Sequence, residues 1–408
     1  MKPPGDPERA RKHLAKTGAR LTYVDPEGRI RVFIPGRSNR MLALPGRPPG
    51  LPAMDGVETP KWPSWSPTGE WIAAAGVADD GKTGGVFVFD AHRSRRSRWI
   101  PLQSAPMYSC WLPGHKAIGA LISEKDRLHL FALDATRRVV VPRSIAKGMP
   151  LFFHARPDGT EIAIHTTEMA TGPGRHVRIW DTREAPESSL VLTQRAGRLR
   201  SPVFSPQGAL LAYGEKSERG REYTDLCIVD LKGKKVRPPI AFKGPGAASF
   251  SRDGRHLALV AGEVGNIPLF GQAAIISAWG GEPSPLYEGP IGSIEWVDDS
   301  RLIAVVAGES GVHWVLFDRR SASCSRISPP LSPTRDALFY AHFFDQFSRT
   351  HPLVSANGRY VSYAAQYGGE RAGVEPHIFL LDLERSSTPE IVGPGMMPAW
   401  ELPALMSE

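Results

Sequence analysis

One stretch in the C-terminal third of the chain carries side chains that could bind a ligand or a divalent metal. Within residues 334–351, these are His342, Asp345, Gln346, Arg349 and His351. On a helix, His342, Asp345 and Arg349 would share one face, because they are three and seven residues apart. Imidazole nitrogens and carboxylate oxygens are ordinary ligands of divalent metals. The alternative metal set is therefore His342, Asp345 and His351.

The same stretch also supports a purely structural interpretation. It is rich in aromatic residues, namely Phe339, Tyr340, Phe343, Phe344 and Phe347. Burial of such rings is strongly favourable, so they could anchor the stretch as a plug. The polar residues would then bond to nearby loop backbone and to one another. Both interpretations remain open at the level of the sequence.

The elements that must position this stretch follow from an internal repeat. Residues 204–213, Phe-Ser-Pro-Gln-Gly followed by an alternating strand, form a strand, a tight turn and a second strand. The residue in the place of Phe204 recurs at Trp65, Trp111, Ala155, Phe204, Phe250, Trp296 and Val354, and then at Trp400. The intervals are 44–49 residues except for the 58 between Trp296 and Val354, which marks residues 334–351 as an insertion. A repeat of about 40–50 residues built from short strands is typical of a β-propeller blade. We expect the bulky members of this column to pack between blades.

A second column follows the first. A later strand of most repeats ends in an acid: Asp90, Asp134, Asp181, Asp230, Asp318 and Asp382. A short side-chain acceptor at the start of a turn can bond to the backbone two residues on. We expect each aspartate to open the turn between the third and fourth strands. One repeat departs from the pattern and reads Ser-Ala-Trp-Gly-Gly at 277–281.

These two columns resemble the TolB-type, WD-repeat-like β-propeller family. The resemblance rests on the Ser-Pro-Asp-Gly type of turn, the alternating strand after it and the strand that ends in Asp. It covers nearly all of residues 20–403 and implies an all-β propeller. It implies no particular activity, since such repeats occur in translocation proteins, in accessory domains of peptidases and in lyases. Some propeller lyases hold a metal with His and Gln, but they carry more histidine than this chain has around the same strand.

The repeat predicts an all-β fold with eight blades. Seven repeats are complete, and the eighth blade would combine three N-terminal strands, beginning at Leu21, with one C-terminal strand at 399–402. Such closure of the ring removes free sheet edges. The alternative is seven blades. We expect a basic, flexible tail at 1–19, one propeller domain at 20–403 and a short tail at 404–408.

Charge and composition narrow the classes of partner. The formal net charge is +8, and one basic cluster comprises Arg93, Arg95, Arg96 and Arg98. Such a cluster can attract phosphates. It carries no interleaved aromatic residues, so single-stranded nucleic acid is not expected as a partner. A solvated turn is the simpler interpretation.

The cysteines and the hydropathy pattern bear on location. The three cysteines, Cys110, Cys227 and Cys324, have no metal-type spacing. No segment approaches the roughly 20 apolar residues that a membrane-spanning helix needs. Residues 1–9 lack the apolar centre of a signal peptide. We therefore expect a cytoplasmic protein that is not inserted in a membrane.

The sequence favours an interaction module over an enzyme. It has no Gly-x-Ser-x-Gly elbow and no glycine-rich phosphate loop before a helix. The hypothesis is a non-catalytic scaffold, without a cofactor, that docks a protein partner on one rim. The docking segments would be the 334–351 insertion and the loops at 166–175, 213–225 and 262–272. The alternative is a metal-dependent enzyme or a small-ligand site around the insertion.

Overall fold

The structure is a computed structural model that describes most of the chain in two compact units. The described residues are 19–35, 42–43, 61–77, 84–92, 97–114, 116–137, 139–169, 172–262, 270–308, 311–366, 375–384 and 389–402. Unit 1 comprises residues 1–145 and 349–408, and unit 2 comprises residues 146–348. The predicted tails, apart from residue 19, and most of the loop at 262–272 lie outside the described residues, as do two residues of the loop at 166–175.

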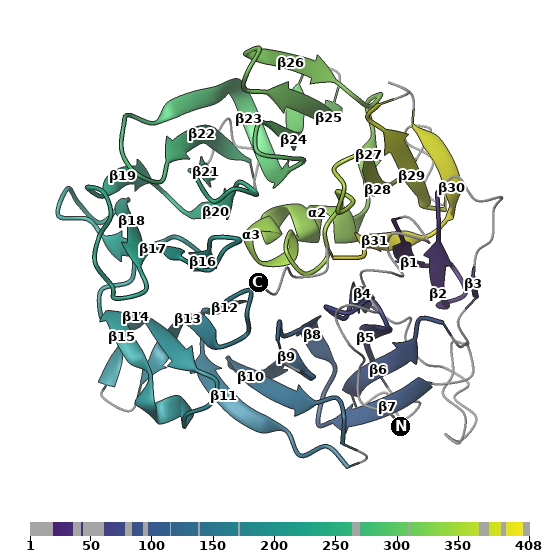
Figure 1. The fold of residues 1–408 in the computed structure, drawn as a ribbon, viewed down its shortest axis with the longest axis horizontal. Coiled ribbons are helices and arrows are strands. Elements are labelled where there is room, and N and C mark those ends of the chain that lie inside the picture. Colours follow the sequence, from purple (N-terminus) through teal and green to yellow (C-terminus); the bar gives the residue numbers. More distant parts are fainter. Residues whose placement is uncertain are drawn as a thin grey trace. The chain divides into compact units, whose positions relative to one another are not determined.

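Unit 1 contains antiparallel sheets of short strands (Figure 1). One sheet has the strands β4 (Lys61–Trp65), β5 (Trp71–Val77), β6 (Gly84–Asp90) and β7 (Ser97–Leu102). The next has β8 (Pro106–Trp111), β9 (Ala117–Glu124), β10 (Arg127–Asp134) and β11 (Arg143–Gly148), whose last residues pass into unit 2. A third contains β28 (Tyr360–Gln366), β29 (His377–Asp382) and β30 (Glu390–Pro394).

The last sheet of unit 1 joins the two ends of the chain. Its order is β3 (Leu42–Ala43), β2 (Ile30–Phe33), β1 (Leu21–Val24) and β31 (Met396–Trp400). Leu21 pairs with Trp400 in the register between β1 and β31. The expected pairing of three N-terminal strands with one C-terminal strand is therefore present.

Unit 2 repeats the same four-stranded pattern. One sheet has β12 (Leu151–Ala155), β13 (Glu161–Met169), β14 (Gly172–Asp181) and β15 (Leu190–Thr193), with the short helix η1 (Pro186–Ser188) before β15. The next has β16 (Val203–Phe204), β17 (Leu210–Lys216), β18 (Tyr223–Asp230) and β19 (Ile240–Lys243). A seven-stranded sheet follows, with β20 (Gly246–Phe250), β21 (His256–Ala261), β22 (Gly271–Ser277), β23 (Ser284–Trp296), β24 (Arg301–Gly308), β25 (Gly311–Asp318) and β26 (Ser323–Arg326). The short strand β27 (Ser332–Pro333) precedes two helices.

The aspartates at the ends of the third strands close their turns as the sequence predicts. Each accepts a hydrogen bond on Oδ1 from the backbone N–H two residues later, at distances of 2.9–3.1 Å. In the departing repeat, Ser277 takes this place, and its hydroxyl lies 3.4 Å from the Trp279 nitrogen. The regular turns are thus locked by one side chain each, and the Ser277 turn is held more weakly by its own cap.

Tryptophans of the first column connect successive repeats. The indole Nε1 donates to a backbone carbonyl of the preceding repeat in four pairs: Trp65 to Ala399 (3.1 Å), Trp111 to Ser64 (3.2 Å), Trp296 to Ser249 (2.9 Å) and Trp400 to Leu353 (2.9 Å). Each acceptor comes directly before the column residue of its own repeat. All four rings are buried. The prediction that this column packs between sheets is confirmed.

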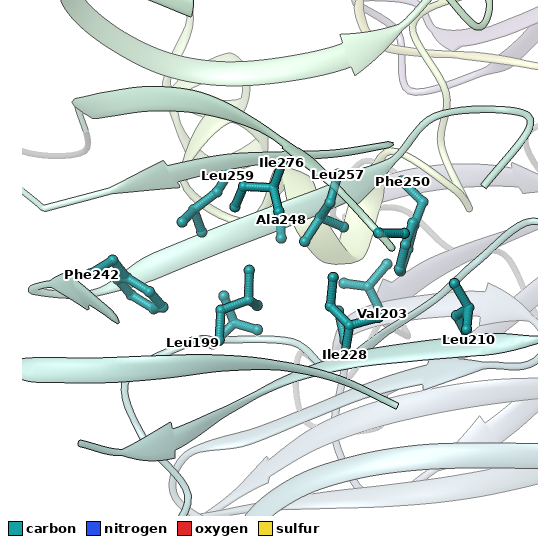
Figure 2. Packing of buried hydrophobic residues seen from close by; sticks show 13 residues of the cluster. Leu199, Val203, Leu210, Ile228, Phe242, Ala248, Phe250, Leu257, Leu259 and Ile276 are labelled. Atoms are coloured by element: carbon teal, nitrogen blue, oxygen red, sulfur yellow. The ribbon is translucent and has the colours of Figure 1, made fainter. Parts of the chain in front are cut away.

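Apolar side chains fill the space between neighbouring sheets. Figure 2 shows one such layer in unit 2, between the β16–β19 sheet and the first strands of the seven-stranded sheet. Leu210 and Ile228 face Leu257 and Ile276 across it, and all four are buried. The alternation along each strand directs these residues to the shared layer. Neighbouring repeats therefore share one continuous core.

An ion pair clamps the joined ends in unit 1. The Arg20 guanidinium donates to both carboxylate oxygens of Glu401 and to the Gly69 carbonyl, and it lies 4.6 Å from the Trp65 ring centroid. Arg20 and Glu401 are both buried. A two-pronged guanidinium–carboxylate contact fixes orientation as well as distance. The clamp holds β1 and β31 in register beside the first complete repeat.

Helices are few and short among the described residues. The longest, α2 (Arg335–His342), has 8 residues, and α3 (Phe344–Phe347) has 4. No helix in the described part of the chain has the length and apolarity to cross a membrane.

Replacement of Trp296 by Phe tests the bond between repeats. Phe250 and Phe204 occupy the same place in other repeats, so the ring should fit, but the Ser249 carbonyl would lose its donor. An unsatisfied buried acceptor costs about 1–3 kcal/mol. We expect urea unfolding to show a loss of that size. The exposed Trp279→Phe variant is the control and should differ from the parent by less than about 0.5 kcal/mol.

Candidate functional site

The 334–351 insertion forms two short helices rather than one. Thr334 caps α2 by accepting a hydrogen bond from the Ala337 nitrogen at 3.1 Å. The helix ends at Phe343, whose φ of −111° and ψ of 28° are not helical. α3 begins directly afterwards. The break places His342 at the end of one helix and Asp345 in the next, so the expected shared helical face does not form.

Aromatic residues anchor both helices inside unit 2. Tyr340, Phe344 and Phe347 are buried. The Tyr340 hydroxyl donates to Glu295 Oε2 at 3.0 Å, on the inner part of β23. α3 contacts β12, β20 and β23, which are the inner strands around it (Figure 1). The aromatic residues therefore fix the insertion as a packed element of the unit, as the structural interpretation expects.

Asp345 is the most deeply buried acid of the insertion. It is 1 % exposed, and its Oδ2 accepts a hydrogen bond from the Ser201 nitrogen at 3.0 Å. Its Oδ1 has no hydrogen-bond partner and lies 3.9 Å from Arg200 Nε, which is also without one. Burial raises the pKa of Asp345, and the Arg200 charge and backbone N–H groups oppose that shift. The Arg200 and Asp345 side chains are therefore close enough to attract each other but form no hydrogen bond.

His342 and His165 both contact Arg200. The Arg200 guanidinium donates to His342 Nδ1 at 3.1 Å, so this nitrogen must be the acceptor of a neutral ring. Burial and the Arg200 charge lower the pKa of His342 to about 4. His165 donates from Nδ1 to the Arg200 carbonyl at 2.8 Å, and its buried Nε2 has no partner. Arg200 is thus the centre of a polar cluster that comprises His165, Arg200, Ser201, His342 and Asp345.

Gln346 and Arg349 lie at the C-terminal end of the insertion. Gln346 is buried within α3. Arg349 is partly exposed and makes no hydrogen bond or ion pair with any described residue. Loss of hydration lowers its pKa to about 10. Arg349 belongs to unit 1, whereas Gln346 belongs to unit 2.

His351 is built into the core of unit 1. Its Nε2 donates to the Trp62 carbonyl at 3.1 Å, and its Nδ1 lies 2.9 Å from the Thr350 hydroxyl. The Tyr108 hydroxyl lies 2.7 Å from that same Thr350 oxygen. Burial lowers the pKa of His351 to about 4. Both ring nitrogens are occupied, so the imidazole holds a loop to two strands.

The described residues show no assembled metal site. No three side chains of His, Cys, Asp or Glu come together there in a group that could hold an ion. His342 Nδ1 and both nitrogens of His351 are engaged with protein groups. The alternative metal set of His342, Asp345 and His351 therefore finds no support in the described part of the chain.

Only one member of the predicted basic patch falls in the described residues. Arg93, Arg95 and Arg96 lie outside them. Arg98 donates from its guanidinium to the carbonyls of Ala135 and Arg137, and burial lowers its pKa. This arginine caps a neighbouring turn, a role that the sequence pattern did not indicate.

Sequence reasoning missed the centre of the polar cluster. Arg200 and Ser201 precede β16 by a few residues and match no motif. His165 lies in β13, and one of its buried ring nitrogens has no partner. Their meeting with Asp345 depends on contacts across about 144 positions of sequence. No local signal could have located it.

Solved structures similar to this chain support the fold. An eukaryotic initiation factor matches with a TM-score of 0.56 and 13 % identity over 95 % of this chain and 99 % of the other. A puromycin-hydrolyzing peptidase of Mycobacterium tuberculosis matches with a TM-score of 0.53 and 17 % identity over 84 % of this chain. The chain spans only 54 % of that peptidase. At these identities the likeness concerns the fold alone.

Two further solved structures show a lower likeness to the chain. The β-propeller domain of the Trilobed protease from Pyrococcus furiosus has 14 % identity and a TM-score of 0.49, over 82 % of this chain and 98 % of that one. TolB from Acinetobacter baumannii has 14 % identity and a TM-score of 0.39, over 79 % of each chain. No protein-family model matches the chain, and no curated protein matches it by sequence. The described part of the chain is an all-β structure of repeated, mostly four-stranded sheets.

Removal of the Asp345 carboxylate should destabilise unit 2. In Asp345→Ala the buried Ser201 N–H would lose its acceptor and Arg200 its nearest counter-charge. We expect a loss of about 2–4 kcal/mol in urea unfolding. The matched control is Glu218→Ala, which breaks an exposed ion pair with Arg195 in the same unit and should cost less than about 1 kcal/mol. Equal effects of the two changes would contradict the assignment.

The buried histidines should make stability depend on pH below neutrality. Burial lowers the pKa of His351 from its ordinary value of 6.5 to about 4, so the ring stays neutral in the fold while the unfolded chain takes up a proton. Its contribution is complete above pH 6.5 and is lost as pH falls towards 4. The slope is about 1.4 kcal/mol per pH unit for each such histidine. His342 acts in the same sense, and the raised pKa of Asp345 acts in the opposite sense.

Replacement of His351 by Gln separates this contribution. Glutamine can still donate to Trp62 and accept from Thr350, but it does not titrate. Urea unfolding at pH 7, 6 and 5 should show a shallower loss of stability in His351→Gln than in the parent. An unchanged slope would mean that His351 carries a proton in the folded protein.

Proposed function

We propose that this chain is a non-catalytic interaction module, an eight-bladed TolB-like β-propeller that binds a protein partner. Two features support eight blades. The long strand β23 ends one group of four strands and begins the next, so the seven-stranded sheet counts as two blades. The sheet that joins both chain ends supplies the composite blade. A propeller of this kind is a rigid frame that presents its outer strands and turns.

The observation that carries the proposal is the placement of exposed apolar side chains. The described residues have seven large ones, and five belong to outer strands or to the segments that lead into them: Val139 (75 % exposed), Val141 (79 %), Leu190 (54 %), Trp279 (62 %) and Ile391 (63 %). Aromatic side chains are enriched in the core of protein–protein interfaces. We therefore place docking on the outer part of the sheets.

The insertion supports the frame rather than the contact. Asp345, Gln346 and His351 are 1 %, 5 % and 2 % exposed. A partner at the surface would not reach these side chains. The loop around 217–222 is more accessible, but ion pairs tie it to its surroundings through Glu218 with Arg195 and Glu222 with Lys243.

A second candidate is a small polar ligand at the Arg200 cluster. Buried polar atoms without partners are unusual, and three occur here, on His165, Arg200 and Asp345. A ligand that offered both a donor and an acceptor would satisfy them, after some displacement of α3. The likeness to a peptidase fits an enzyme about as well as it fits an interaction module. The interaction module is preferred because the exposed indole of Trp279 is a side chain that commonly anchors protein contacts.

Purification of the native protein from its own cells tests the choice. We expect mass spectrometry to find a protein partner in near-stoichiometric amount and elemental analysis to find no bound divalent metal. The same result is expected from the Asp345→Asn variant, which keeps an acceptor for Ser201. A monomer that carries a metal or a small molecule, and loses it in Asp345→Asn, would overturn the proposal in favour of the ligand site.

A further inference from the structure

The turn between β22 and β23 presents a tryptophan that the fold does not use. Trp279 is 62 % exposed. Its indole makes no hydrogen bond, ring contact or cation–π contact with any described residue. Gly280 and Gly281 follow it, and a Cβ placed on either would meet no atom within 4 Å. The indole therefore projects from an open turn.

The base of this turn is nevertheless held firmly. Arg237, which is only 9 % exposed, donates to the Ser277 carbonyl at 2.6 Å and to the Gly281 carbonyl at 2.9 Å. The Ala278 nitrogen donates to the Arg255 carbonyl at 2.9 Å, and the Ala278 side chain is buried in the core cluster of Figure 2. The residues on both sides of Trp279 are thus fixed. A partner would need to immobilise little beyond the indole itself.

This turn is also where the repeat departs from its own rule. Elsewhere the third strand ends in an aspartate that bonds to the backbone two residues later. Here Ser277 stands in that place, and its bond is longer, at 3.4 Å. Arg237 of the preceding repeat holds this turn, as Arg98 holds the regular turn after Asp134. A local rule broken and then compensated is expected at functional positions.

Exposed cations lie on the two segments that bond to the base of the turn. Arg255 is exposed, and its side chain has no hydrogen-bond or ion-pair partner among the described residues. Lys232 and Lys234 are exposed and unpaired in the same part of the structure, on the turn that leads to Arg237. Glu282 is the exposed acid nearest in sequence to Trp279. Cations around an apolar anchor complement an acidic rim around an apolar pocket.

We infer that Trp279 is the anchor of the docking surface and that its partner is a protein with an apolar pocket bordered by Asp and Glu. The inference rests on the proposed interaction function and adds the residue and the chemistry of the partner. Tryptophan is the side chain most often found to dominate binding energy when it fills a pocket. A nucleic-acid strand fits less well, because a single indole gives no row of stacking platforms.

Two matched pairs of variants test the inference in the full-length chain. Trp279→Ala is compared with Leu190→Ala, which removes another exposed apolar side chain of unit 2. The double variant Lys232→Glu/Lys234→Glu is compared with Arg219→Glu. Arg219 is an exposed, unpaired cation before β18, at the opposite end of that strand from Lys232. Unchanged thermal unfolding of each variant confirms that the fold is intact.

The tagged proteins are captured from their own cells, and the recovered proteins are quantified by mass spectrometry. We expect one protein to be lost with Trp279→Ala and retained with Leu190→Ala. After purification of that protein, titration should show binding about 100-fold weaker for Trp279→Ala. The lysine double variant should bind more weakly at low salt and converge with the parent at high salt, whereas Arg219→Glu should match the parent.

The contrary outcomes separate the two proposals. A partner that binds Trp279→Ala as well as the parent overturns this inference and leaves the interaction function in place. Absence of a stoichiometric protein partner from every sample overturns both. The difference in fluorescence between parent and Trp279→Phe reports on residue 279, with a 20-nucleotide poly(dT) strand and phosphatidylglycerol vesicles as probes. A shift with either probe would assign Trp279 to nucleic acid or lipid instead.

Discussion

The hydrogen bond from an indole to the inner strand of the preceding repeat is the contact on which this structure depends. A four-stranded sheet of this size buries only part of its apolar surface and needs a neighbour on each face. The indole N–H of Trp65, Trp111, Trp296 or Trp400 fixes that neighbour at one height, because its acceptor always precedes the equivalent residue of the previous repeat. The same side chain thus fills the space between two sheets and provides a hydrogen bond for a buried carbonyl. Trp65 and Trp400 extend the pattern to the sheet that joins the chain ends.

The helical insertion is also held by both packing and hydrogen bonds, but some of its buried polar atoms have no hydrogen-bond partner. Aromatic residues fix α2 and α3 on the inner strands of unit 2, and Asp345 bonds to the backbone ahead of β16. Arg200 lies beside the Asp345 carboxylate, and its guanidinium also donates to the neutral ring of His342. Three polar atoms there have no partner, on His165, Arg200 and Asp345. These three atoms lower the stability of the folded state, and the packing of the surrounding aromatic rings must offset that loss.

The turn at residues 277–281, where the repeat departs from its pattern, is the part of the fold on which the proposed function depends. Regular turns are closed by an aspartate, and the Asp134 turn is held in addition by Arg98 of the preceding sheet. The Trp279 turn has lost that cap, and a buried arginine from the preceding repeat holds it instead. The turn therefore carries an exposed indole and is still held rigidly at its base. Rigidity matters because an ordered anchor loses less entropy on binding than a mobile one.

Much of the fold could be predicted from the sequence, because its determinants are local and repeated. The turn glycines, the capping aspartates and the column of Trp65, Trp111 and Trp296 recur at a regular spacing, so each repeat confirms the others. The pairing of both chain ends follows from the same count. The break at Phe343, the role of Arg200 and the occupied nitrogens of His351 could not be predicted, since each depends on residues far away in sequence. The sequence alone determined which segments become strands and turns. Only the tertiary structure decided which polar groups meet, because burial and hydrogen bonding are properties of neighbours in space.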